Sequence, residues 1–132
     1  MLDSRFIVDN ADLVRESLSR RCADESAVAT LERIIEIDAI RRSLISQTDE
    51  LRALRNQLTK QIGPMMREGR AEEAAPLRAE VGEAAAKLSA LDEQLDLIAS
   101  EQKTLLLTVP NMLDERVPKG KSDKDNIEVR SW

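Results

Sequence analysis

Few side chains in this sequence of 132 residues could take part in covalent chemistry. The chain contains no His, so it offers no Ser–His or Cys–His nucleophile pair and no imidazole ligand for a metal ion. Its four glycines are too few for a loop that cradles phosphate groups. The single Cys22 excludes an internal disulfide and is interpreted as a structural or incidental residue. We therefore expect no catalytic residue, cofactor or metal ion in this chain.

Two adjacent carboxylate pairs, Glu72-Glu73 and Asp92-Glu93, are the remaining candidates for acid–base chemistry. Both pairs fall in a segment with coiled-coil spacing, where acidic residues usually form a solvated face. We interpret them as surface residues.

Binding chemistry is better supported, because the basic residues are unevenly distributed. The formal net charge of −5 argues against a general nucleic-acid binder. Residues 1–50 (seven basic, eleven acidic) and 71–132 (eight basic, thirteen acidic) are both acidic, whereas residues 51–70 carry +4. The charged residues of that segment are Arg52, Arg55, Lys60, Arg67, Arg70 and Glu68. Such a segment suits a polyanion held away from an acidic stem, although basic residues are also common on coiled-coil flanks.

The element that would present this segment is a long helix within Ala71–Val109. Its apolar residues recur at alternating intervals of four and three, which is the heptad pattern of a coiled-coil seam. The series is Leu77, Val81, Ala84, Leu88, Leu91, Leu95, Ile98, Gln102, Leu105 and Val109. A stripe this narrow must be covered by a second helix.

The residues on the other side of the basic segment supply that second helix. Its series is Ile37, Ile40, Leu44, Gln47, Leu51, Leu54, Leu58 and Gln61. Two long helices joined by a short turn run antiparallel. The preferred register places Leu51 beside Leu91, and the alternative, shifted by about a heptad, places Leu51 beside Ala84.

The predicted fold is all-α: a long antiparallel two-helix coiled-coil hairpin with a short N-terminal helix at its base and a C-terminal linker. The arm helices are expected at about 27–63 and 74–109, joined by a tip at about 64–75. Gly63 and Pro64 are expected to end the first arm helix.

The N-terminal residues are expected to form the base of the hairpin. Leu2–Val8 reads as extended, and Asn10 as the N-cap of a short helix over about 10–21. The apolar stripe of that helix is Leu13, Val14 and Leu18. It is too short to be stable alone and must pack on the long helices.

The C-terminal residues have a different character. Residues 110–126 are rich in Pro, Gly, Asp and Lys without periodicity, as in a linker. Ile127–Arg130 then alternates apolar and charged residues like a strand, with no partner strand in the sequence. We expect a helical arm domain at 1–109, a linker and first strand at 110–132, and a further domain beyond.

The sequence also favours a soluble, cytoplasmic protein without a membrane partner. No apolar run approaches the roughly 18 residues that span a bilayer. The first residues, Met1–Phe6, lack the basic-then-apolar order of a signal peptide.

Several segments resemble the N-terminal domain of bacterial seryl-tRNA synthetases. Residues 50–63, ELRALRNQLTKQIG, resemble the first arm helix with its Arg-Asn-x-Leu-Ser/Thr-Lys pattern. Residues 105–111, LLLTVPN, resemble the end of the second arm helix. Residues 117–120 and 125–132 resemble the linker into the catalytic domain. Together these segments cover essentially the whole chain in the right order.

The resemblance implies an arm that docks between the T-loop region and the long variable arm of serine tRNA, largely through shape and backbone contacts. The candidate nucleic-acid-binding residues, carried over by position, are Arg52, Arg55, Asn56, Lys60, Arg67, Arg70 and Arg78. The parent enzyme would be an ATP-dependent serine–tRNA ligase, with ATP and Mg²⁺ bound in a C-terminal catalytic domain that also forms a homodimer. Without that domain this chain should be inactive.

A function of a different class stays open. A coiled-coil protein-interaction or oligomerisation module without a nucleic-acid role would show the same heptads. Binding of serine tRNA distinguishes the two.

Overall fold

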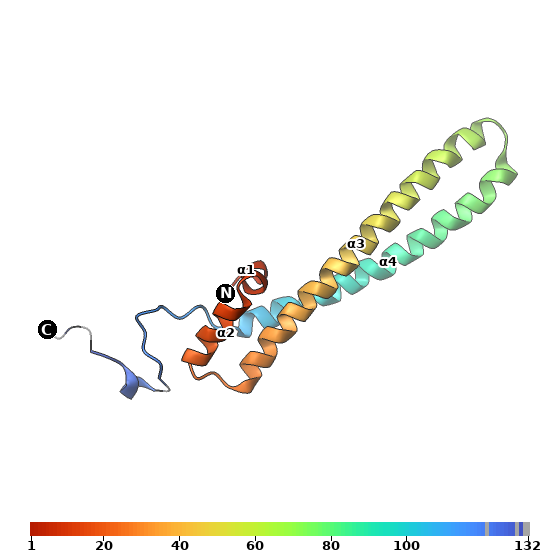
Figure 1. The fold of residues 1–132 in the computed structure, drawn as a ribbon. Coiled ribbons are helices and arrows are strands. Elements are labelled where there is room, and N and C mark those ends of the chain that lie inside the picture. The colour runs from red at the N-terminus through yellow and green to blue at the C-terminus, as the bar shows by residue number, and fades with distance from the viewer. Residues whose placement is uncertain (121, 129, 131–132) are drawn as a thin grey trace. The chain divides into compact units, whose positions relative to one another are not determined.

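The computed structural model describes residues 1–120, 122–128 and 130. Its elements are α1 (Ser4–Asp9), α2 (Ala11–Arg20), α3 (Glu25–Arg67), α4 (Ala71–Thr108) and the short 3₁₀ helix η1 (Asp123–Asp125) (Figure 1). The long helices α3 and α4 pack against each other, and no strand occurs in the described residues. The prediction of an all-α helical hairpin is confirmed.

The alternating segment at 127–130 forms no strand at its described positions, and Val129 lies outside the described residues. A strand needs a neighbouring strand to pair its backbone groups. The described part of the chain contains none.

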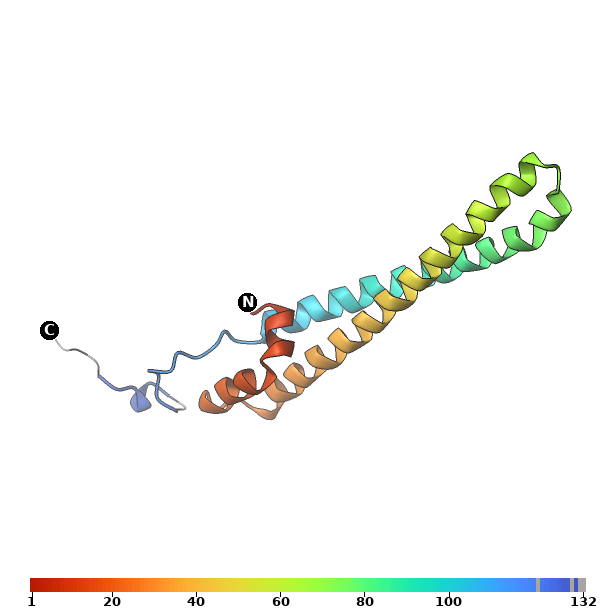
Figure 2. The same ribbon diagram turned by 45° about the horizontal axis from the view of Figure 1, so that its top comes forward.

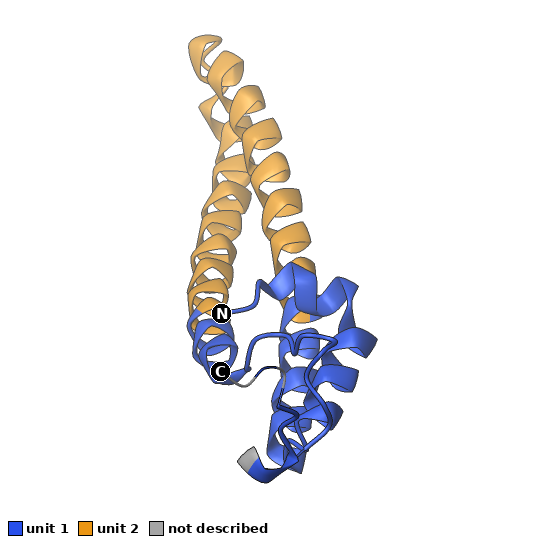
Figure 3. Cartoon of the chain, turned by 90° about the vertical axis from the view of Figure 1, so that its left-hand side faces the viewer, with its two compact units in different colours: residues 1–39, 100–132 blue, residues 40–99 orange. Residues whose placement is uncertain are grey.

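The chain divides into two compact units (Figure 3). Residues 1–39 and 100–132 form the first, called here the base unit, and residues 40–99 form the second, called the hairpin unit. Within the hairpin unit α3 and α4 run antiparallel and side by side, as two views agree (Figure 1, Figure 2).

The first residues of the base unit form helix α1 instead of the extended segment expected at Leu2–Val8. The Asp3 carboxylate caps this helix by accepting hydrogen bonds from the backbone N–H groups of Arg5 (2.9 Å) and Phe6 (3.3 Å). Ile7 is fully buried in the core. The extended prediction was wrong because the cap and this burial outweigh the weak local preference of a short mixed segment.

One apolar cluster holds the base unit together. Its buried members are Ile7, Val14, Leu18, Leu31, Ile34, Leu106 and Val109. Helix α2 matches the short helix expected near residues 10–21, but Leu13 is 53% exposed and lies outside the cluster. Asn10 stands at the N-cap position without making the predicted bond. Its Nδ2 donates instead to the carbonyl oxygen of Phe6, at 3.0 Å.

Two ion pairs join helices of the base unit. Arg15 of α2 binds Glu32 of α3 (Nε to Oε1, 2.8 Å), and Arg33 of α3 binds Glu101 of α4 (Nε to Oε1, 2.8 Å). The hydrogen bond from Arg15 holds the pKa of the Glu32 carboxyl below its usual range. The ionised form of the Glu32 carboxylate therefore stabilises the folded state.

Acid should weaken the base unit through this pair. The folded pKa of Glu32 is lowered, so its stabilisation is complete above the unfolded pKa of about 4.3 and is lost as the pH falls through the folded value. Replacing Glu32 with Gln should therefore reduce the loss of melting temperature between pH 7 and pH 3, measured by circular dichroism. Glu16→Gln, at an exposed position of α2, is the control. An equal loss in Glu32→Gln and in the unmodified chain would contradict this expectation.

The seam of α4 is confirmed position by position. Between Ala71 and Ser100, the residues shielded from solvent are the predicted seam residues from Leu77 to Ile98. Ala74, which precedes them, is shielded as well. Ala84 and Leu88 are only 4% and 5% exposed. All other residues of that stretch are exposed.

The seam of α3 is only half of the predicted one. Ile37 and the residues at every seventh position after it are shielded as expected: Leu44, Leu51 and Leu58. The other predicted members are exposed: Ile40, Gln47, Leu54 and Gln61. The residues that directly follow them take their places: Arg41, Thr48, Arg55 and Ile62.

Helix rotation explains the error in α3. Ile40 and Leu54 are apolar, so the pattern favoured them over the Arg that follows each. In the structure the seam accepts Arg41 and Arg55, whose aliphatic stems can pack while their charges reach water. Thr48 is 1% exposed, and its hydroxyl donates to the Leu44 carbonyl oxygen at 2.9 Å, so no polar atom there is left unpaired.

The register follows from the short turn and the shielded residues. Counted outward from the turn between Arg67 and Ala71, the shielded residues of the two helices meet layer by layer: Ile62 with Leu77, Leu58 with Val81 and Leu51 with Leu88. Leu51 thus lies opposite Leu88, between the two partners expected from the sequence, Leu91 and Ala84. The ion pair between Arg52 Nη2 and Asp92 Oδ1 (3.2 Å) joins residues that lie beside this seam.

The observed seam predicts unequal effects for two leucines one helical turn apart. Leu58 is 8% exposed and Leu54 is 46% exposed. Leu58→Ala should lower the free energy of unfolding by about 2–3 kcal/mol, because it leaves a cavity in the seam. Leu54→Ala should cost less than about 1 kcal/mol. Urea unfolding followed by circular dichroism measures both, and equal costs would contradict the observed rotation of α3.

Candidate nucleic-acid interface

The turn between the long helices is shorter than the tip expected at 64–75. Helix α3 continues through Gly63 and Pro64 to Arg67, and α4 begins at Ala71. Pro64 lies in the last turn of α3, so it removes the backbone hydrogen bond that the Lys60 carbonyl oxygen would accept, but only three helical residues follow it.

Gly69 is the residue that ends α3. Its φ of +75° is left-handed, a conformation open to glycine at little cost. The N–H of Gly69 donates to the Met66 carbonyl oxygen (3.3 Å), and the N–H of Arg70 donates to that of Met65 (2.9 Å). This is the Schellman arrangement, which needs its glycine just past the helix. The prediction that Gly63 and Pro64 end the helix was therefore wrong.

The turn itself is not the basic part of the hairpin unit. Arg70 Nη2 lies 2.7 Å from Glu68 Oε2, and its Nη1 lies 3.4 Å from Glu73 Oε2. Residues 67–73 contain two Arg and three Glu, a net charge of −1. The available positive charge therefore lies along the helices that lead to the turn.

Arg52 is held on the surface by two carboxylates. It contacts Asp92 of α4 as described above, and its Nη1 lies 3.8 Å from Asp49 Oδ1. Its side chain is 50% exposed. An exposed ion pair contributes only about 0–1 kcal/mol. A phosphate group could therefore replace Asp92 at little cost.

Arg55 and Asn56 are neighbours in different settings. Arg55 occupies a seam position and is half-buried, so it is less available to a ligand than the sequence indicated. Asn56 is exposed one position further on, where its amide can donate and accept hydrogen bonds.

Among the candidate residues, the most available cations are Lys60, Arg67 and Arg78, which are all exposed. Within the described residues none of the three makes an ion pair or a side-chain hydrogen bond. Lys60 and Arg67 come from the last turns of α3, and Arg78 comes from the second turn of α4. All seven candidate residues thus belong to the hairpin unit.

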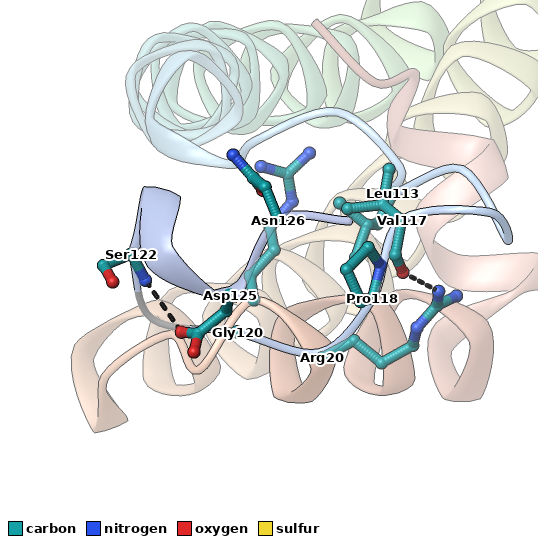
Figure 4. A pocket seen from close by; sticks show the side chains of 9 residues that line it. Arg20, Leu113, Val117, Pro118, Gly120, Ser122, Asp125 and Asn126 are labelled. Carbon is teal, nitrogen blue, oxygen red and sulfur yellow. Dashed lines mark hydrogen bonds between the residues drawn. The ribbon is translucent and has the colours of Figure 1, made fainter. Parts of the chain in front are cut away.

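Sequence reasoning overlooked two arginines that bind the C-terminal segment inside the base unit. Arg20 Nη2 donates to the carbonyl oxygens of Glu115 (3.0 Å) and Val117, and Arg21 Nη2 donates to that of Asn111 (3.0 Å). They border a cavity of about 360 Å³ (Figure 4). These guanidinium groups already bind backbone carbonyls, so the cavity is a poor anion site. No local pattern signals contacts between residues so far apart in the chain.

No group of three or more His, Cys, Asp or Glu side chains in the described part of the chain could hold a metal ion. Nor does any helix there combine the length and apolar character needed to cross a bilayer.

The fold and the exposed cations define an antiparallel coiled-coil hairpin module with a cationic surface. The particular family follows from comparison with known proteins. The chain belongs to the seryl-tRNA synthetase N-terminal domain family, whose model matches residues 1–113. The resemblance seen in the sequence is confirmed.

Relatives with this domain are named serine–tRNA ligases. That of Mesoplasma florum is 34% identical over 132 residues, which is all of this chain and 31% of the relative. That of Methanoregula boonei is 39% identical over 130 residues, 98% of this chain and 30% of the relative. That of Trichlorobacter lovleyi is 35% identical over 132 residues, all of this chain and 30% of the relative. The chain thus spans less than a third of the length of these relatives.

Proposed function

We propose that this chain is the tRNA-binding arm of a serine–tRNA ligase and that its hairpin unit docks on the long variable arm and T-loop region of serine tRNA. The observation that carries the proposal is the set of exposed, unpaired cations Lys60, Arg67 and Arg78 on the described hairpin of a chain from this family. Arg52, Arg70 and Asn56 extend this surface, and Arg55 contributes from the seam.

The surface suits recognition of the RNA backbone. Arginine presents a planar fork of donors that matches phosphate oxygens, and Lys60 adds a point charge. Residues 40–99 contain no Phe, Trp or Tyr, so the hairpin unit has no aromatic ring on which a base could stack. Recognition would therefore rest on the shape of the tRNA and on its phosphate and ribose groups.

The ligation of serine belongs, in this proposal, to the part of the relatives that the chain does not match. That part would bind ATP and Mg²⁺ and would form the homodimer contact. The arm would act in the cytoplasm, where it would hold the tRNA for that reaction. The chain alone is expected to bind serine tRNA without charging it.

Neutralising the cations should weaken tRNA binding. Changing Arg52, Arg55, Lys60, Arg67 and Arg70 together to Ala should lower the affinity for serine tRNA by at least about tenfold near 0.1 M salt, because fewer counterions are released. The salt dependence should also become shallower. Gel shifts over a salt series measure both quantities.

Two controls accompany that variant. Its melting temperature must be compared with that of the unmodified chain, because Arg55 lies in the seam. Changing Arg5 and Lys103, two exposed cations of the base unit, should leave binding nearly unchanged. Unchanged affinity in the five-residue variant would refute the proposal and favour an interaction module without a nucleic-acid role.

The choice of RNA element can be tested on the tRNA side. Deleting the long variable arm of serine tRNA should reduce the affinity far more than replacing the anticodon, because the proposed contacts are with the variable arm. Gel shifts measure the affinity of the chain for the intact transcript, the deleted form and the anticodon variant. If the anticodon variant lost as much affinity as the deleted form, docking on the variable arm would be wrong.

A further inference from the structure

The seam gives the hairpin unit two flanks that can be told apart by heptad position. In an antiparallel pair, the residue that directly follows Leu51 of α3 borders the same side of the seam as the residue that directly follows Leu91 of α4. The Arg52–Asp92 ion pair crosses the seam on that side. Arg78 stands two heptads before Asp92 and therefore lies on the same flank. We call this side the Arg flank and the other side the Glu flank.

The two flanks differ in charge near the turn. Between residues 51 and 90, the Arg flank carries Arg52 and Arg78 and has no Asp or Glu. Over the same span the Glu flank carries Glu73, Glu80 and Glu83 on α4 against Lys87, together with the exposed Leu54 of α3. Lys60 and Arg67 lie on the outer side of α3, facing away from the seam. A polyanion would be attracted to one flank and repelled by the other.

The Arg flank also has two glycines inside its helices, Gly63 of α3 and Gly82 of α4. A glycine within a helix costs about 1 kcal/mol relative to Ala. A Cβ added at either position would meet nothing within 4 Å, so packing inside the chain does not require glycine there.

Along the Arg flank, Gly82 lies between the two arginines. Gly63 is four residues before the end of α3 at Arg67, whereas Gly82 is eleven residues after the start of α4 at Ala71. At about 1.5 Å per residue, Gly63 therefore lies roughly 10 Å nearer the turn than Gly82. Arg78 lies one helical turn from Gly82, towards the α3–α4 turn, and Arg52 lies on the other side of Gly82. The result at Gly82 is a low, uncharged stretch of surface with an arginine at each end.

We propose that the sugar–phosphate backbone of an RNA crosses the hairpin on the Arg flank, at the level of Gly82. Arg78 binds a phosphate on one side of the crossing, and Arg52 binds one on the other side after exchanging Asp92 for it. The absence of a Cβ atom at Gly82 lets the strand approach the backbone of α4. This inference rests on the proposed function and adds which side of the hairpin faces the RNA.

A matched pair of charge reversals tests the flank. Arg78→Glu and Lys87→Glu make the same type of charge change at exposed positions of α4, on the Arg flank and the Glu flank respectively. In gel shifts of the full 132-residue chain with a serine tRNA transcript, Arg78→Glu should lower the affinity at least about tenfold, whereas Lys87→Glu should change it by less than about threefold. Equal effects, or a larger effect of Lys87→Glu, would overturn the assignment.

A second matched pair tests the crossing point. Gly82→Leu and Ala90→Leu each place a leucine on the exposed surface of α4, on opposite flanks. Leucine is the better helix former, so Gly82→Leu should melt at a temperature equal to or above that of the unmodified chain. It should nevertheless bind the transcript several-fold more weakly, while Ala90→Leu binds normally. Full binding by Gly82→Leu would overturn the crossing at Gly82.

The inference can fail independently of the tRNA-binding proposal. If neutralising the five cations abolishes binding but Arg78→Glu and Lys87→Glu act alike, the flank assignment falls and the tRNA-binding role stands. If the neutralised variant binds as before, the tRNA-binding role itself falls and the flank assignment falls with it.

Discussion

The seam between α3 and α4 is the constraint on which the hairpin unit depends. Each helix has one narrow stripe to bury, so the rotation of each helix and the register between them decide what every other residue faces. The shielded residues, paired outward from the short turn, report that register in the hairpin unit. Because heptad positions repeat along straight rows, the seam also sorts the remaining charges into two flanks without any further folding.

The seam is unequal in its two helices. The α4 side is apolar except for Gln102, whereas the α3 side includes Thr48 and two arginines. Thr48 satisfies its hydroxyl within its own helix, but Gln102, which is 8% exposed, has no hydrogen-bond partner for its Nε2 among the described residues. Polar groups in a seam reduce stability but help to select one register over its neighbours. In α3 the apolar Leu54 is exposed, and the neighbouring Arg55 is partly shielded in the seam instead.

The cations of the hairpin unit stand mainly on regular helix and not on a flexible loop. The Schellman arrangement at Gly69 lets α3 continue to Arg67, and the three-residue turn that follows carries no net charge. Helix positions have fixed spacings, so the backbone positions from which these side chains extend are set before a ligand arrives. Such preorganisation reduces the entropy lost when a rigid partner binds.

The sequence by itself determined the all-α class, the seam of α4, the absence of His and hence of imidazole chemistry, and the family resemblance. Each of these depends on composition or on a period that one helix displays alone. Only the tertiary structure decided whether Leu54 or Arg55 faces the seam, where α3 ends, that residues 4–9 form a helix, and which arginines are paired. The α3 pattern suits two helix rotations almost equally, because an apolar residue stands beside each true seam position that Arg occupies. Burial against the partner helix decides which rotation α3 adopts, and the pattern of a single helix does not carry that information.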